Sequence, residues 1–239
     1  MIRTRGIVIR EMKYLESSKI LTVLTKNYGK ISVMARGVLR PKSLNTNSAS
    51  LFSLSEFEFY KGRNIYYLNS SNILEIFYGI RSDNKKFLYA SYFAELVNET
   101  ILPGDEANKI FEMLIKALQV LNYGEASPLL VLAFQLKHIS ILGFRPELTS
   151  CLECGRTNST DWRFSFESGG IMCSDCYDSS SEKISGEDII LLNNLLFAKF
   201  DDIFSMEELT SLKLVNLMNK YIVRSFELKN FKSFKFIEG

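Results

Sequence analysis

The sequence has few of the residues on which most enzyme chemistry depends. Its 239 residues include one histidine, His138, and no Gly-x-Gly-x-x-Gly motif. His138 lies in an apolar helical run, where a packed histidine is much more common than a catalytic one. No Ser-His-Asp set is suggested. These absences argue against nucleophilic and dinucleotide-dependent catalysis, and we expect a protein that is not an enzyme.

Two further sequence patterns that could indicate an enzyme do not support one. Residues 37–43 (GVLRPKS) superficially resemble a phosphate-binding loop, but the glycine before Lys42 is missing and Pro41 lacks an amide donor. The carboxylate pairs Asp201-Asp202 and Glu207-Glu208 fall at helix-cap spacing, where acidic residues have a structural use. A metal-dependent nuclease is therefore only a third hypothesis.

Long apolar runs are absent as well. The longest, residues 129–134, is far too short to span a bilayer. Residues 1–14 alternate charged with apolar side chains and contain no apolar core, so we expect no signal peptide. Thiols reserved for a metal, without an export signal, indicate a cytoplasmic protein with no membrane association.

The four cysteines are concentrated in one short segment. They form Cys151-x2-Cys154 and, after 18 intervening residues, Cys173-x2-Cys176. Each pair brings two thiolates onto one tight turn, and two such turns close a tetrahedral shell around one zinc ion. With all four positions filled by sulfur, no site remains for a water, so the zinc should be structural. Two disulfides, or four thiols with no shared role, are the alternatives to this interpretation.

Charge is distributed unevenly along the chain. Residues 1–80 hold 12 Arg and Lys against 5 Asp and Glu, a net charge of +7, whereas the remainder holds 17 against 22, or −5. The cysteine segment is itself acidic, which favours a structural insertion over a zinc ribbon that reads nucleic acid. A basic first part indicates a polyanionic ligand, and chance solvation of a β surface is the alternative.

Hydrophobic periodicity changes near the same place. Up to residue 80 the period is two, which predicts five strands around residues 7–9, 20–24, 31–35, 54–59 and 65–67. A long polar and basic connection, residues 36–50, follows the third strand. Five strands with one long middle connection are typical of an OB-fold Greek-key barrel, which we assign to residues 1–80.

After residue 80 the period is helical. Helices are predicted over residues 84–101 and 106–123, and a third from Pro128, capped by Ser127, to near Gly143. Two more should begin at N-terminal caps formed by Ser185 with Asp188 and by Ser205 with Glu208. The predicted fold class is therefore α+β, with a helical domain over residues 81–239 that contains the zinc-binding segment 149–178.

Several motifs carry a resemblance to a known family. They are the helix-ending run Gly143-Phe144-Arg145-Pro146-Glu147-Leu148, the following Cys151-Leu152-Glu153-Cys154-Gly155, the phrase ILTVLTKNYGK at residues 20–30, and Ala35-Arg36-Gly37. In this order, behind a basic five-stranded barrel, they resemble the RecO family of bacterial DNA repair and recombination mediators over the whole chain.

The resemblance implies a function and a set of partners. It implies a non-enzymatic, nucleoid-associated protein that binds single- and double-stranded DNA and promotes ATP-independent annealing and recombinase loading. Its implied protein partners are RecR and the single-strand DNA-binding protein, whose acidic C-terminal tail would bind in the helical domain. No motif in this chain locates that groove.

The basic residues of the barrel are the candidates for DNA contact. Arg36, Arg40 and Lys42 share the long connection, which we expect to be flexible and to face phosphates. Secondary candidates are Arg3, Arg5, Lys26 and Lys30. The competing hypothesis is a zinc-dependent interaction or transcription-regulating module, which should prefer one duplex sequence and not anneal strands.

Overall fold

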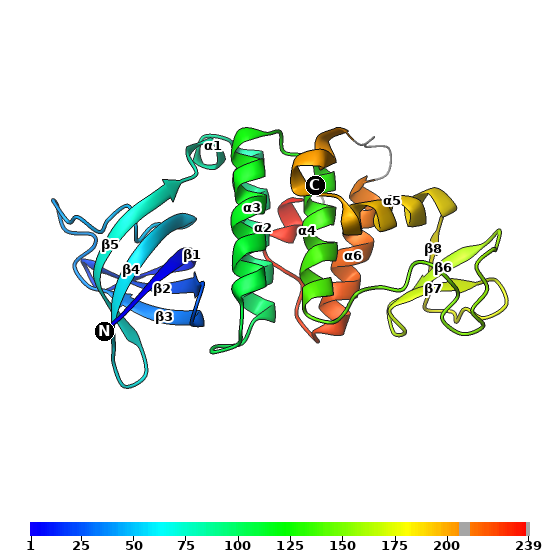
Figure 1. The fold of residues 1–239 in the computed structure, drawn as a ribbon, viewed down its shortest axis with the longest axis horizontal. Helices are drawn as coiled ribbons and strands as arrows, with labels where there is room; N and C mark the ends of the chain where they lie inside the picture. The colour runs from blue at the N-terminus through cyan, green and yellow to red at the C-terminus, as the bar shows by residue number, and fades with distance from the viewer. Residues whose placement is uncertain (206–210, 238–239) are drawn as a thin grey trace. The chain divides into compact units, whose positions relative to one another are not determined.

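Five strands close into a barrel at the N-terminal end of the chain (Figure 1). They are β1 (Ile2–Tyr14), β2 (Ser18–Thr25), β3 (Gly29–Ala35), β4 (Ser53–Lys61) and β5 (Tyr66–Ile76). The order around the barrel is β1-β2-β3-β5-β4, with β4 paired back onto β1. The structure, a computed structural model, describes residues 1–205 and 211–237. This strand order confirms the predicted OB-type barrel within an α+β fold.

Alternating side chains fill the barrel. Val23, Val33, Phe57 and Phe59 are completely buried, and the rings of Phe57 and Phe59 stack with centroids 5.2 Å apart. The period of two in the sequence thus separates an apolar interior from a polar exterior. Phe57 and Phe59, which lie two residues apart in the predicted strand over residues 54–59, both face this interior.

Three helices complete the first compact unit, Met1–Gly124. They are α1 (Tyr78–Arg81), α2 (Asn84–Thr100) and α3 (Asn108–Tyr123), of which α2 packs on β1 and α3 on β2. The side chain of Asp83 caps α2 by accepting a hydrogen bond from the Lys86 backbone N–H at 3.0 Å. The proposed domain boundary after residue 80 stays a prediction, and it falls inside this unit.

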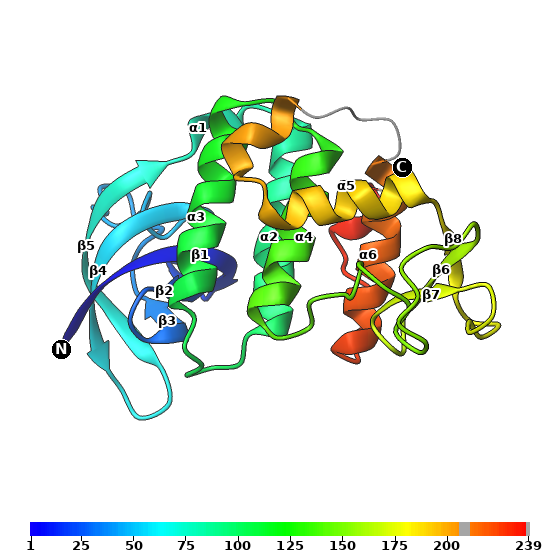
Figure 2. The same ribbon diagram turned by 45° about the vertical axis from the view of Figure 1, so that its right-hand side comes forward.

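The second unit, Glu125–Gly239, is built around α4 (Pro128–Ile141). As predicted, Ser127 caps α4 and Pro128 occupies its first turn. The helix is apolar on nearly every side, which is typical of a helix buried all round. Figure 2 shows α6 (Ser211–Ser225) beside it. The Gln135 side-chain amide donates to the Val215 carbonyl of α6 at 3.1 Å.

A capping box opens α5 (Gly186–Phe197). The Ser185 hydroxyl accepts from the Asp188 backbone N–H at 3.0 Å, and the Asp188 carboxylate accepts from the Ser185 N–H at 3.1 Å. The predicted cap at this position is confirmed. The second predicted cap, formed by Ser205 with Glu208, involves residues 206–210, which lie outside the described residues. Two short 3-10 helices, η1 (Phe200–Ser205) and η2 (Phe234–Phe236), also belong to this unit.

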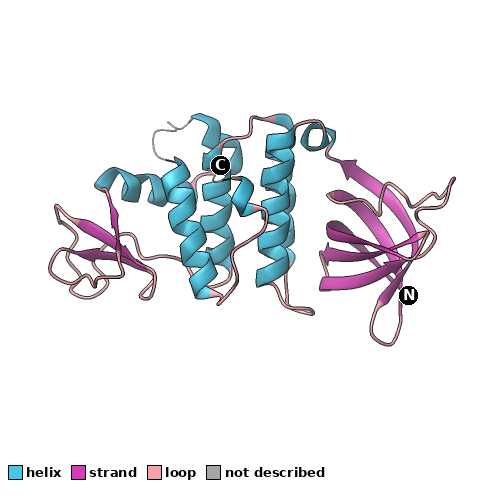
Figure 3. Ribbon diagram, turned by 180° about the vertical axis from the view of Figure 1, so that it is seen from behind, coloured by secondary structure: helices cyan, strands magenta, loops and turns pink. Residues whose placement is uncertain are grey.

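The cysteine segment contains a small sheet that the sequence did not predict. Its strands β6 (Trp162–Ser165), β7 (Gly170–Cys173) and β8 (Glu182–Ile184) pair antiparallel in the order β7-β6-β8, as the smaller group of strands in Figure 3 shows.

Toward the C-terminus, Phe231 and Phe234 are buried. Within residues 1–205 and 211–237, no helix is long and apolar enough to cross a membrane.

The buried histidine of α4 should make stability depend on pH. Burial lowers the pKa of His138 to about 3, against about 6.5 in an unfolded chain. The neutral form is favoured when folded, so its stabilisation is present above pH 6.5 and lost as pH falls toward 3. The loss can reach about 1.4 kcal/mol per pH unit.

We expect a His138→Gln variant, which cannot titrate there, to have a flatter profile of unfolding free energy against pH. Urea unfolding of both proteins between pH 5 and pH 8 tests this, because acid effects shared by the two proteins cancel in the difference. Parallel profiles below pH 6.5 would show that His138 does not titrate as its burial requires.

Candidate metal centre and nucleic-acid interface

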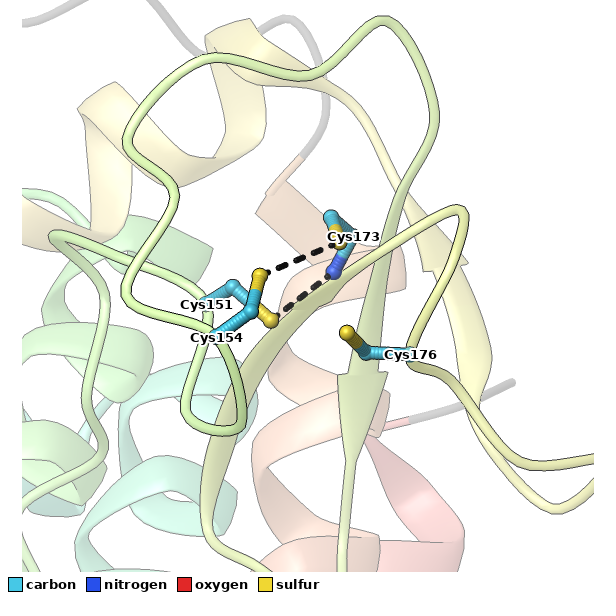
Figure 4. Close-up of side chains that lie close together, drawn as sticks. All are labelled: Cys151, Cys154, Cys173 and Cys176. Atoms are coloured by element: carbon cyan, nitrogen blue, oxygen red, sulfur yellow. Dashed lines mark hydrogen bonds between the residues drawn. The ribbon is translucent and has the colours of Figure 1, made fainter.

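Four thiols converge in the second unit (Figure 4). The sulfur atoms of Cys151, Cys154, Cys173 and Cys176 all lie within 4.8 Å of one another. The Sγ atoms of Cys154 and Cys173 are 3.7 Å apart. A tetrahedral site with metal–sulfur bonds of about 2.3 Å has sulfur–sulfur edges of about 3.8 Å. The four side chains therefore fit one tetrahedral metal ion, and the predicted cysteine set is brought together.

Two tight turns position the cysteines. In the first, the Gly155 N–H donates to the Cys151 carbonyl at 2.9 Å, and Gly155 has a φ of +72°, which suits a residue without a Cβ. In the second, the Cys176 N–H donates to the Cys173 carbonyl at 3.1 Å. Each Cys-x2-Cys pair thus presents two sulfur atoms from one turn, as the spacing predicted.

The electrostatics of the cluster favour a bound cation. Burial would raise the pKa of Cys151, but backbone N–H groups directed at its sulfur outweigh burial and lower that pKa to about 6. One of these donors is the Cys173 N–H, 3.4 Å from the Cys151 sulfur. Contacts with the thiols of Cys154 and Cys173, together with burial, raise the pKa of Cys176 to about 12. Four adjacent sulfur atoms cannot all ionise without a positive charge between them, and a divalent ion supplies it.

A metal ion held by all four sulfur atoms would have no open position for a water molecule. Four sulfur ligands fill a tetrahedral shell, so such a site is closed and stabilises the fold. Cys151 and Cys173 are buried, whereas Cys154 is exposed. The Arg156 guanidinium also pairs with Asp175 at 2.7 Å and so links the two turns from outside.

The cysteine segment and the residues on either side of it pack on α6. The Tyr221 hydroxyl donates to the Phe144 carbonyl at 3.2 Å, and the Phe164 ring meets the Tyr221 ring edge-on with centroids 5.4 Å apart. Lys220 pairs with Glu182 at 2.6 Å. These contacts offset part of the acidic charge of the segment and hold its sheet against the helix.

The connection that carries Arg36, Arg40 and Lys42, expected to be flexible, is anchored to the barrel by hydrogen bonds and buried side chains. Val38 and Ala49 are buried in the barrel core. The Leu39 N–H donates to the Ser17 carbonyl at 2.9 Å, and the Thr46 hydroxyl donates to the Val38 carbonyl at 2.7 Å. The two anchors fix the backbone between them. The three basic side chains are exposed on a structured loop.

The four secondary candidates occupy different environments. Arg3 pairs with Glu56 at 2.6 Å on the barrel surface, and Arg5 is exposed on the same strand. Lys26 pairs with Glu112 of α3 at 2.8 Å, and the Lys30 ammonium donates to the Asn98 carbonyl of α2. The structure thus brings Lys26 and Lys30 to the contact between the barrel and its helices, apart from the loop.

Three groove residues were not identified as candidates from the sequence. Lys13, Tyr14 and Tyr67 line a groove together with Arg36 and Arg40. Tyr67 lies at core spacing in the sequence, yet it is only half-buried and carries the Arg36 guanidinium over its ring, 4.6 Å from the centroid. The one signal in the sequence was Lys13 directly before Tyr14 at the first turn.

Two family models match successive parts of the chain. The model described as "Recombination protein O N terminal" matches residues 1–77, and that described as "Recombination protein O C terminal" matches residues 81–234. Together with the fold, they define a recombination protein in which a barrel precedes a helical part that contains the four-cysteine cluster.

Full-length relatives agree with this class. Proteins named "DNA repair protein RecO" from three bacteria are among those similar to this chain. The protein of Alkaliphilus metalliredigens is 38% identical and the match covers 98% of this chain and 97% of the relative. The Acetivibrio thermocellus protein is 34% identical over 99% and 96%, and the Caldicellulosiruptor saccharolyticus protein is 30% identical over 99% of both. The chain belongs to the RecO family of DNA repair proteins.

The contact of Lys30 with the end of α2 predicts that this side chain stabilises the fold. Its ammonium contacts a carbonyl in the last turn of α2, where unpaired carbonyls and the helix dipole favour a cation. Burial lowers the pKa of Lys30, an effect that the carboxylates of Glu99 and Asp105 partly offset. A Lys30→Met variant, which keeps the alkyl stem, should lower the free energy of unfolding by about 1 kcal/mol.

The matched control is Lys26→Met. Because Lys26 makes a more exposed ion pair, its loss should cost at most about 0.5 kcal/mol. Chemical denaturation measures both changes. A Lys30→Met protein of unchanged stability that loses a phosphate contact, seen as a flatter salt dependence of DNA binding, would place Lys30 in the DNA interface instead.

Proposed function

We propose that this chain is a recombination mediator that binds single- and double-stranded DNA and promotes ATP-independent strand annealing. The observation that carries the proposal is the fixed array of Arg36, Arg40 and Lys42 on the barrel of a protein from a DNA repair family. Its site of action would be the chromosomal DNA of the bacterial cytoplasm. Recombinase loading with RecR and the single-strand DNA-binding protein completes the proposed role.

The physical mechanism needs no fuel. Two DNA strands repel each other through their phosphates, and a protein that neutralises phosphates releases counterions and lowers this barrier. The net charge of +7 on residues 1–80 supplies the neutralising field. An OB barrel adds a strand face and rim loops along which a single strand can lie with its bases exposed for pairing.

The two proposed protein partners are inferred from membership of the RecO family. An acidic tail of the single-strand DNA-binding protein requires a cationic surface, and the second unit exposes Lys229, Lys232 and Lys235 beside the buried Phe231 and Phe234. The aromatic residues anchor this stretch, so the lysines are held at the surface. No residue of this chain is assigned to RecR binding.

The non-enzymatic character and the metal belong to the same proposal. His138 is buried in the helical core, away from solvent, and a closed four-sulfur site has no position for a reactive water. The metal that best suits four thiolates in a tetrahedron is zinc. Its proposed role is to hold the small sheet β6–β8 in place.

The metal proposal predicts composition and stability. Purified protein should contain about one zinc per chain, and Cys151→Ser should lower the thermal stability of the second unit, since a three-sulfur site loses most of its folding free energy. DNA binding should partly survive, because the barrel lies in the other compact unit.

Metal analysis and calorimetry provide the measurements, and Glu153→Gln is the control. This substitution alters the same turn and leaves all four sulfur atoms intact. A metal-free preparation with full thermal stability would disprove the structural role. Equal destabilisation by Glu153→Gln would mean that the turn, not the ligand set, is sensitive.

The annealing proposal predicts a specific defect in a loop variant. Replacing Arg36, Arg40 and Lys42 together with Ala should slow annealing of complementary strands and weaken binding to unrelated single-stranded sequences. Each phosphate contact contributes about 0.7 to the slope of log affinity against log salt, so the slope should flatten by about 2. Fluorescence annealing and anisotropy assays without ATP or magnesium measure these effects.

A control variant that loses three positive charges elsewhere distinguishes the effect of the loop residues from the effect of net charge. Lys85, Lys109 and Lys116, exposed on α2 and α3, are replaced with Ala. This control should keep annealing activity and the salt slope close to wild type. An absolute ATP requirement, strand cleavage, or binding to only one duplex sequence would refute the proposal, the last in favour of a regulatory module.

A further inference from the structure

A groove on the first unit combines flat aromatic surface with positive charge. Its walls are the turn from Tyr14 to Ser18 between β1 and β2, the chain from Met34 through Arg40, and Tyr67 at the start of β5. The cavity volume is about 920 Å³, within the range of ligand-binding clefts. The whole groove lies in one compact unit, so its geometry depends on a single folded body.

Two of the residues that line the groove form a cation–π pair. The Arg36 guanidinium lies over the Tyr67 ring, 4.6 Å from the centroid. Tyr67 is fixed because β5 pairs with β3 in parallel, with Tyr67 opposite Met34. A guanidinium plane supported on one side by an aromatic ring offers its other side to a second flat group. Arg36 is therefore placed to contact a base with this side while its charge still neutralises a phosphate.

The turn supplies a second aromatic surface. Tyr14 ends β1 and is 41% exposed, and Leu15 beside it is 75% exposed. Leu15 has a φ of +55°, a left-handed conformation that costs a residue with a Cβ on the order of 1–2 kcal/mol. Such strain is concentrated at ligand-binding segments. The strained turn holds Tyr14 at the groove wall.

Charge decides the class of ligand. Lys13, Arg36 and Arg40 line the groove against one carboxylate, that of Glu16, so the lining has a net charge of +2. A ligand must therefore be anionic as well as flat. A duplex buries its bases in the helical stack, whereas a single strand can turn one base outward into a groove.

We propose that this groove binds one unstacked nucleotide of a single strand, with its base against Tyr14 and the Arg36–Tyr67 pair and its phosphate at Arg40. The inference rests on the proposed DNA-binding function and refines it. The three basic residues of the loop then have two roles. Arg36 and Arg40 line the groove and bind the nucleotide there, whereas Lys42 lies outside the groove. The groove also distinguishes single from double strands, which charge alone does not.

The experiment compares Tyr14→Leu with wild type, in the full chain, on three probes. These are a thymidine oligonucleotide, a strand of the same length in which abasic sites replace the bases, and a duplex. Loss of one stacking contact should weaken binding to the thymidine strand about tenfold. Affinities for the abasic strand and the duplex should stay unchanged, as should the salt slope on every probe.

Three further variants make the result specific. Tyr14→Phe keeps the ring and should bind like wild type. Tyr123→Leu changes an exposed tyrosine at the end of α3, outside the groove, and should have no effect. Arg40→Gln should weaken binding to all three probes and flatten the salt slope. Thermal unfolding of each variant establishes that the fold is intact.

The outcomes separate this inference from the proposal on which it rests. An equal loss on thymidine and abasic strands, or no loss on either, would overturn base stacking at Tyr14 while leaving DNA binding itself in place. Wild-type protein that binds none of the probes would overturn the proposed function. A defect in Tyr14→Phe equal to that in Tyr14→Leu would assign the effect to the hydroxyl and also contradict stacking.

Discussion

Closure of the barrel is the constraint on which the first unit depends. β1 pairs with both β2 and β4, and the parallel pairing of Val33 with Tyr66 and Met34 with Tyr67 joins β3 to β5. Closure joins the two outer strands of the sheet at these residues and encloses the apolar core. The same parallel pairing sets Tyr67 beside the end of β3, from which Arg36 projects. The core and the groove therefore depend on one contact between strands distant in sequence.

The second unit uses two kinds of stabilisation for its two parts. Helix α4 is buried all round by apolar packing, with few polar groups to satisfy. The segment from Cys151 to Cys176 is rich in glycine, serine and acidic residues and forms only short strands. The segment nevertheless buries Trp162, Phe164 and Ile171, and a metal ion held by its four sulfur atoms would add ligand bonds to this small apolar core. The contacts of Tyr221 and Lys220 then fix the ordered segment onto α6.

Local signals in the sequence predicted local structure well. The cysteine spacing, the Ser127 cap and the alternation in β2 and β3 each depend on residues a few positions apart, and the structure has all three. The placement of Lys30 could not be predicted, because it depends on α2 packing beside β3. The sheet β6–β8 was missed for a related reason: its strands have three or four residues each, too few for a period of two to be recognised.

The basic loop shows how packing changes the meaning of a sequence pattern. Residues 36–50 are polar, basic and rich in serine and asparagine, a composition typical of flexible connections. Val38 and Ala49 insert into the barrel core, however, and the polar side chains hydrogen-bond to backbone carbonyls within the loop. A loop held in this way loses little conformational entropy when it binds a ligand. Arg36 loses still less, because its guanidinium already rests on Tyr67. In the proposed function, positive charge would attract DNA from a distance, and the prior ordering of the loop would reduce the entropy lost on contact.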